Sequence, residues 1–234
     1  MKLKRDDIYD LDSWFKAAPP MGAAKQWRDG RSAKELARYM TANFPSVPTE
    51  IENILSDFTT PDAEFDWNGE YVTDFEKYNL GRGEGRNHDA FMWNEDVVVG
   101  IEGKADESLG SQLVGDAMIG ATDNKMHRIR GMIKMLFGDE PVNHKNIRYQ
   151  LVTATAATLL EAKERKVNNA VILVLVFKKQ GCFSEQKIAS NNADIETFLL
   201  ETSAERCKKY YSIPTVFGKE NNINLYFKKI EFEI

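Results

Sequence analysis

The chain has 234 residues, with 31 Lys and Arg against 36 Asp and Glu, so its formal net charge is −5. This acidic balance argues against a general nucleic-acid coat, although a nuclease stays open because it needs positive charge only along one groove. Two cysteines, Cys182 and Cys207, are too few for a disulfide framework, and no Cys/His spacing suits zinc.

Membrane insertion and export are not expected. The longest apolar run, Ala170 to Phe177, is far short of the ~20 residues of a transmembrane helix. The charged N-terminal residues have no apolar stretch behind them, so we expect no signal peptide. These features predict a cytoplasmic protein in a reducing compartment, with no membrane partner.

The first sixty residues are predicted to be helical. Apolar side chains recur at helical spacing over residues 33–44, after Ser32 as the expected N-cap. A second helix is expected over residues 50–58, with Thr49 as its cap.

A β-hairpin is predicted next. Residues 88–93 and 96–105 form strand-like runs, the second rich in valine and isoleucine, joined by the polar pair Asn94-Glu95. Residues 108–137 then carry an apolar stripe that indicates helix, although each glycine in it costs about 1 kcal/mol against alanine.

The pattern after the hairpin indicates an α/β protein. A strand over 148–154, a helix over 156–166 and a strand over 170–177 predict a parallel pair joined by a crossover helix. A further helix over 194–208 and a strand over 224–233 follow. We expect a single domain over residues 1–234, in which residues 181–234 form a C-terminal α/β extension.

Three charged residues lie on strands that are otherwise apolar: Asp89, Glu102 and Lys104. Charges inside a sheet are costly unless they are paired or bind something. A turn at Asn94-Glu95 places Asp89 opposite Gly100, so all three charged side chains share one face. Two carboxylates placed diagonally fit a hard divalent ion such as Mg²⁺, and Lys104 can orient a water nucleophile beside them.

Asp89, followed after the hairpin by Glu102-Gly103-Lys104, resembles the D…(D/E)-x-K signature of the restriction-endonuclease-like, or PD-(D/E)XK, nuclease superfamily. The surrounding run is similar to that of uncharacterised, mostly bacterial proteins assigned to this superfamily. His88 stands where the family has a proline. The resemblance covers residues 30–180 and implies an αβββαβ core, with a mixed central sheet flanked by helices.

The resemblance implies metal-dependent hydrolysis of a phosphodiester, with Mg²⁺ or Mn²⁺ as cofactor and nucleic acid, DNA first, as substrate. The metal would be held by Asp89, Glu102 and the carbonyl of Gly103, and Lys104 would serve the water nucleophile.

The resemblance also suggests accessory residues. The helix before the sheet often supplies a further acidic ligand, which would be Glu52, with Glu50 equally compatible by spacing. Gln112 matches a glutamine that lines some related sites. Positive side chains that flank the first carboxylate or lie on an amphipathic helix are candidates for nucleic-acid contact: Arg82, Arg86, His88, Arg128 and Arg130.

Several alternatives stay open. Glu102 and Lys104 would also suit a simple ion pair on an edge strand, which contributes little to stability. A nuclease fold without activity would bind nucleic acid or a protein partner. An acid/base pair acting on glycosides is a further alternative, against which the neighbouring lysine argues. A homodimer is neither predicted nor excluded.

Overall fold

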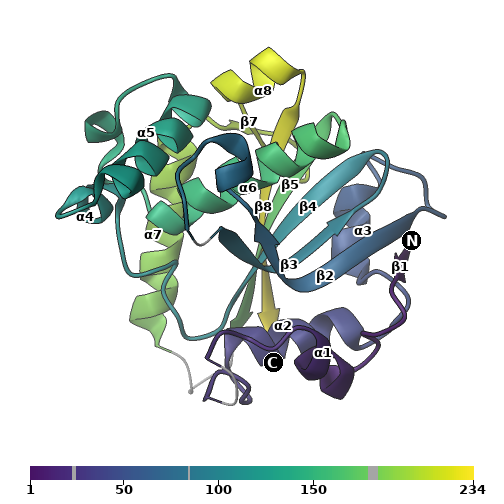
Figure 1. Cartoon of the computed structure of the whole chain (residues 1–234). Coiled ribbons are helices and arrows are strands. Elements are labelled where there is room, and N and C mark those ends of the chain that lie inside the picture. Colours follow the sequence, from purple (N-terminus) through teal and green to yellow (C-terminus); the bar gives the residue numbers. More distant parts are fainter. Residues whose placement is uncertain (23–24, 84, 179–183) are drawn as a thin grey trace.

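The computed structural model describes residues 1–22, 25–83, 85–178 and 184–234, so Cys182 lies outside the described residues. Within these residues the protein is α/β, with one mixed eight-stranded sheet in the order β1-β2-β3-β4-β5-β8-β7-β6 (Figure 1). The strands are β1 (Lys2–Lys4), β2 (Glu64–Thr73), β3 (Arg86–Trp93), β4 (Val97–Lys104), β5 (Asn169–Lys178), β6 (Glu205–Arg206), β7 (Tyr211–Ile213) and β8 (Asn224–Glu233).

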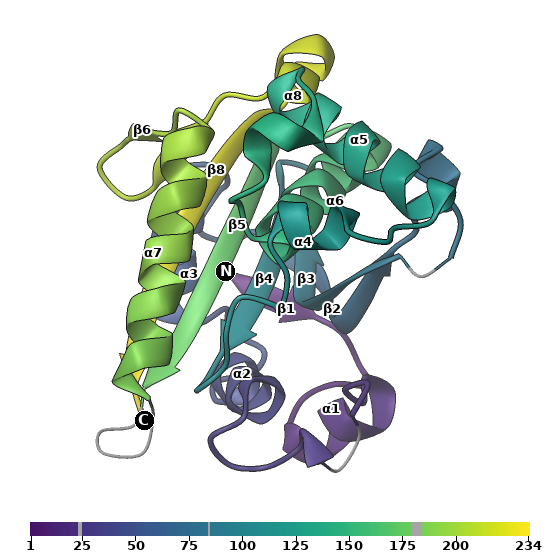
Figure 2. The same cartoon turned by 90° about the vertical axis from the view of Figure 1, so that its left-hand side faces the viewer.

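Helices cover both faces of the sheet (Figures 1 and 2). One face packs against α1 (Leu11–Ala17), α2 (Ser32–Thr41) and α3 (Thr49–Leu55). The other carries α4 (Val114–Met118), α5 (Asp123–Phe137), α6 (Tyr149–Arg165), α7 (Glu185–Glu201) and α8 (Val216–Asn221), with short 3₁₀ turns η2 (Glu76–Tyr78) and η3 (Pro141–His144). In the described part of the chain, no helix is both long enough and apolar enough to cross a membrane.

The centre of the sheet explains the most apolar stretches of the sequence. β4, β5 and β8 run parallel to one another, and β3 pairs with β4 in the antiparallel sense. Every residue of β4 is buried because helices cover it on both sides. The charged pair Glu102 and Lys104 is therefore carried by one of the most enclosed strands of the protein.

The strand predicted over residues 148–154 is wrong, because these residues begin the long helix α6. Nearly every residue from Leu151 to Ala162 is buried, since α6 lies between the sheet and α5. Apolar and small residues therefore occupy all sides of the helix, which hides the 3.6-residue period. The partner of the strand at 170–177 is β4, in a parallel pairing.

Other boundaries also differ from the prediction. The helix expected over 108–137 divides into α4 and α5, where Gly120 adopts a positive φ of 63° between them. The helix expected over 194–208 is α7, which begins and ends earlier. Ser32 and Thr49 are first helical residues and not caps. β8 pairs with β5 along its whole length, so the C-terminal region completes the central sheet.

Candidate functional site

The hairpin of β3 and β4 brings the three predicted charged side chains together. Lys104 Nζ lies 3.8 Å from Asp89 Oδ2 and 4.0 Å from Glu102 Oε2. The predicted register is wrong by two residues, because Phe91 and not Asp89 pairs with Gly100. The regular pairing ends at Ala90 and Ile101, and beyond it the Asp89 side chain accepts from the Gly103 N–H, so Asp89 still meets Glu102 and Lys104.

An irregularity in β2 adds a third carboxylate that the sequence analysis missed. Trp67 packs in the core beneath α1 to α3, whereas Tyr71 stacks on Phe91 on the other face of the sheet, with 4.7 Å between ring centroids. Residues four apart on a regular strand share a face, so β2 changes face between them. Glu70, with a positive φ of 49°, marks this change and lies where β2 passes Asp89.

Glu102 is fixed from several sides. Its side chain is 1% exposed, and Arg86 forms an ion pair with Oε1. Gln150, from the first turn of α6, donates from Nε2 to Oε2 at 2.7 Å. Burial alone raises the pKa of Glu102, but the charge of Arg86, with help from His88 and Lys104, outweighs burial and lowers the pKa. Glu102 is therefore an ionised carboxylate held in one orientation.

The negative charges of Asp89 and Glu70 are less well balanced by neighbouring cations. Asp89 Oδ2 accepts a hydrogen bond from the Gly103 N–H at 2.8 Å, yet burial and the neighbouring charge of Glu102 raise the pKa of Asp89 despite Lys104. Burial, together with the charge of Asp89, raises the pKa of Glu70 to about 7. The cluster thus holds more carboxylates than its cations neutralise, which favours the binding of a further cation.

The donor set fits a magnesium-like ion. Asp89, Glu102 and the Gly103 carbonyl offer only oxygen ligands, which hard divalent cations prefer. Among the described residues, no three Asp, Glu, His or Cys side chains converge closely enough to hold a metal by themselves. Mg²⁺ does not require such a cage, because it commonly binds one or two carboxylates and keeps several waters or phosphate oxygens.

Two open pockets meet at the carboxylates. One, of about 210 Å³, is lined by Glu70, Asp89 and Lys104, and the other, of about 410 Å³, by Phe75, Tyr149 and Gln150 among others. Both are also lined by Met21, Arg86 and Asn87. The shared residues make the two pockets neighbours, with Glu70 and Asp89 in the smaller one.

The predicted glutamine is not the one that contacts a carboxylate. Gln112 lines the larger pocket, and its main-chain oxygen accepts from the Tyr149 N–H at 3.0 Å. The contact to Glu102 comes from Gln150. The sequence analysis missed Gln150 because it assigned residues 148–154 to a strand, where the side chain had no predicted relation to the hairpin.

The acidic residues predicted on the preceding helix have other partners. Glu52 Oε1 accepts from the amino group of Met1 at 2.7 Å, and Glu50 accepts from the Tyr39 hydroxyl at 2.8 Å. α3 lies against the part of the sheet near β1, whereas Ser32 at the start of α2 accepts from the N–H that follows Lys104. The structure therefore does not bring Glu52 to the carboxylate cluster.

Two of the cations predicted to contact nucleic acid are enclosed. His88 has no exposed surface, and burial lowers its pKa, so the prediction that it contacts a ligand at the surface is wrong. Arg86 is 15% exposed and is engaged by Glu102. Its place is inside the carboxylate cluster, where it balances charge.

The other three predicted cations lie further out. Arg128 donates to the carbonyl oxygens of Leu80 and Arg82 and so holds the chain around Gly81, just before β3. The side chain of Arg82 is 89% exposed, and Arg130 is exposed on α5. Arg128 lines the larger pocket beside the carboxylates, whereas neither of the other two does.

Comparison with known families places the chain but not its activity. A family model described as a domain of unknown function, DUF6946, matches residues 7–232. The chain belongs to the DUF6946 family. No curated protein and no solved structure matches it. The function of this DUF6946 member must therefore be argued from its side chains.

Proposed function

We propose that this protein is a metal-dependent nuclease that hydrolyses phosphodiester bonds, with DNA as the first substrate to test. The observation that carries the proposal is the meeting of Asp89, Glu102 and Lys104 on one hairpin, with the lysine amine within 4.0 Å of both carboxylates. Two acids and an amine in this arrangement suit hydrolysis of a phosphate ester assisted by a divalent cation.

The order of the elements supports a restriction-endonuclease-like core. α2 and α3 precede three consecutive antiparallel neighbours, β2, β3 and β4, and α4 to α6 lead to β5, which is parallel to β4. This is the αβββαβ order that the sequence resemblance implies. The D…ExK residues lie on its second and third strands.

The residues have distinct roles in this proposal. Asp89, Glu102 and the Gly103 carbonyl would hold Mg²⁺ or Mn²⁺, which supplies charge neutralisation and Lewis acidity at the phosphate. Lys104 orients the attacking water and stabilises negative charge that develops on the phosphate. Arg86 and Gln150 are positioning residues, because they hold the carboxylate of Glu102 in one orientation.

The pockets support a polymeric substrate. The two neighbouring pockets share Arg86, so they would take successive units of a strand. Polar groups in the larger pocket, which include Gln112 and Arg128, suit contact with a sugar–phosphate chain.

A cleavage assay tests the proposal. Purified protein with Mn²⁺ or Mg²⁺ is offered supercoiled plasmid, linear duplex, single-stranded DNA and RNA. We expect cleavage of at least one substrate, loss of cleavage in EDTA and in Lys104→Ala, and normal cleavage by Lys77→Ala, a matched exposed-lysine control paired with Glu164. If all four substrates remain intact with either ion, the catalytic proposal fails.

One observation favours a second candidate, an inactive nuclease-fold module that binds nucleic acid or a protein. Arg86 and Gln150 together engage both carboxylate oxygens of Glu102. An arginine paired in this way balances the acid without a metal ion. Under this alternative, DNA binding would be unchanged by EDTA, and calorimetry would detect no Mn²⁺ binding.

A further inference from the structure

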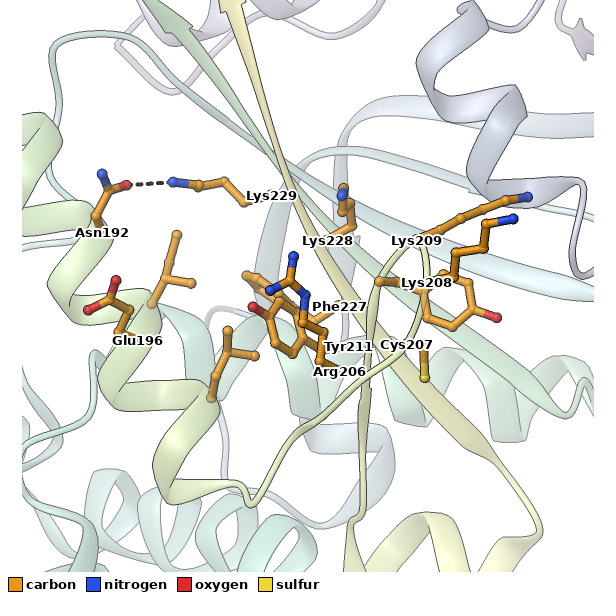
Figure 3. Close-up of a pocket in the computed structure, with 13 residues that line it drawn as sticks. Asn192, Glu196, Arg206, Cys207, Lys208, Lys209, Tyr211, Phe227, Lys228 and Lys229 are labelled. Carbon is orange, nitrogen blue, oxygen red and sulfur yellow. Dashed lines mark hydrogen bonds between the residues drawn. The ribbon is translucent and has the colours of Figure 1, made fainter.

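A separate pocket lies near the β6 edge of the sheet, beside β6, β7 and β8. It has a volume of about 310 Å³ and opens between α7 and these strands (Figure 3). α7 separates it from the carboxylates. Asn191 on α7 bonds the loop after β4 through Leu109 N and Glu107 O, and Asn192, the next residue, accepts from Lys229 in the pocket.

The pairing of the strands aligns a cation with two aromatic rings. Arg206 on β6 pairs with Tyr211 on β7, and Tyr211 pairs with Phe227 on β8. Directly paired residues share a face of the sheet, with Cβ atoms about 5 Å apart. Lys229, two residues after Phe227, projects from the same face. Figure 3 shows Arg206 beside Tyr211 and Phe227, and Lys229 pointing toward Asn192.

The lining is strongly positive for a chain of net charge −5. Five cations contribute atoms to it, Arg206, Lys208, Lys209, Lys228 and Lys229, together with one acid, Glu196. Lys228 alternates to the opposite face from Phe227, so Arg206 and Lys229 are the cations that share the face of Tyr211. Glu231 pairs with Lys229 at 2.9 Å, and Asp57 pairs with Lys209. Within the described ranges, Arg206 and Lys208 form no ion pair, so the pocket retains positive charge for an anionic ligand.

We propose that this pocket binds a nucleotide, with its phosphate on Arg206 and Lys229 and its base against the partly exposed ring of Tyr211, which rests on the buried ring of Phe227. The planar guanidinium of Arg206 matches two phosphate oxygens at once, and aromatic rings stack on any base. The volume lies at the low end of ligand pockets, about 300–1,000 Å³, and suits one nucleotide unit. A free nucleotide and a single nucleotide unit within a nucleic-acid strand both offer this combination of a phosphate and a base.

The proposal is independent of the nuclease activity, and its test is a binding experiment in EDTA, where metal-dependent cleavage does not interfere. Calorimetry compares inorganic phosphate, adenosine and guanosine monophosphates, and a short single-stranded DNA. We expect the nucleotide or the oligonucleotide to bind more tightly than phosphate. The tighter of these two ligands shows whether the pocket takes a free nucleotide or one unit of a nucleic-acid strand.

Matched variants assign the binding to the pocket. Arg206→Glu should raise the Kd about tenfold or more, whereas Lys219→Glu, an equal charge change at an exposed residue of α8, should leave it unchanged. Tyr211→Leu should weaken nucleotide binding but not phosphate binding. Because Arg206 is exposed, Arg206→Glu should retain the wild-type unfolding temperature.

Three outcomes would overturn the proposal. These are no binding of any nucleotide or oligonucleotide, equal weakening by Arg206→Glu and Lys219→Glu, or phosphate binding as tight as nucleotide binding. Each of them leaves the cleavage assay at Asp89, Glu102 and Lys104 unaffected, so the two proposals succeed or fail separately.

Discussion

Two polar clusters each include a residue of α6, and they differ in charge balance. In the first, Tyr71, Glu161 and Arg165 satisfy one another: the Tyr71 hydroxyl donates to Glu161 at 3.0 Å, and Arg165 contacts both. Arg165 also lies 4.5 Å from the ring centre of Trp93. One acid meets one base, so this cluster resembles an ordinary structural ion pair.

The carboxylate cluster has no such balance. Three acids, Glu70, Asp89 and Glu102, are placed around two cations, Arg86 and Lys104. The raised pKa of Asp89 and of Glu70 reflects this surplus together with burial. Buried polar groups alone therefore do not mark a functional site, whereas acids with surplus charge that face an open pocket make a candidate for one.

The largest expected effect is the loss of cleavage in Asp89→Asn. Removal of one surplus carboxylate should lower the metal-dependent cleavage rate by about a hundredfold or more, because the cation loses a ligand. The same change should leave the urea midpoint of unfolding equal or higher, because a poorly compensated buried charge is removed. Normal cleavage by Asp89→Asn, or a large loss of stability, would contradict the difference in charge balance between the two clusters.

The balanced cluster should show the opposite behaviour. Glu161→Ala leaves Arg165 partly buried without its partner and should destabilise the protein by about 3 kcal/mol in urea unfolding. Cleavage by the folded variant should stay normal. Glu164→Ala, on the same helix and paired with exposed Lys77, is the control and should unfold like the wild type. Equal stability of the two variants would contradict the structural role of the cluster.

A smaller effect on the cleavage rate is expected for substitutions of Gln150 and Gln112, and it differs between the two. Gln150→Ala frees the Glu102 carboxylate on one side and should reduce the cleavage rate about tenfold, with little change in substrate affinity. Gln112→Ala should change the rate less than about twofold, because Gln112 lines the larger pocket whereas Gln150 makes the contact to Glu102. Steady-state cleavage kinetics of both variants distinguish these outcomes, and the reverse order would restore the original sequence prediction.

The smallest effect is expected for Glu52→Gln. Its partner is the Met1 amino group and its side chain is 37% exposed, so the cost in stability should stay within about 1 kcal/mol. Cleavage and Mn²⁺ binding should remain at wild-type levels. Loss of Mn²⁺ binding in this variant would show that Glu52 reaches the metal in solution.

The sequence predicted the parts of the site that depend on strand parity. Asp89, Glu102 and Lys104 stand out as charges on apolar strands, and their charged groups meet despite a register error of two residues. The hairpin, β5 and β8 were also predicted, because their β-branched runs lie between clear polar breaks. The sequence resemblance added the order of the core elements.

The remaining parts of the site depend on tertiary structure. Glu70 joins the cluster because β2 changes face at one residue of positive φ, which no periodicity reveals. Gln150 joins it because α6 is buried almost all round and its helical period is hidden. Glu52 was misplaced because spacing along a helix does not show which part of the sheet the helix packs against.

Calorimetric titration with Mn²⁺ tests the central claim most directly, because the claim concerns surplus negative charge and not a particular substrate. Wild-type protein should bind Mn²⁺, and Asp89→Asn and Glu102→Gln should each weaken binding about tenfold or more, while Glu52→Gln should not. No binding by the wild type, or equal binding by all four proteins, would contradict a metal site at the β3–β4 hairpin.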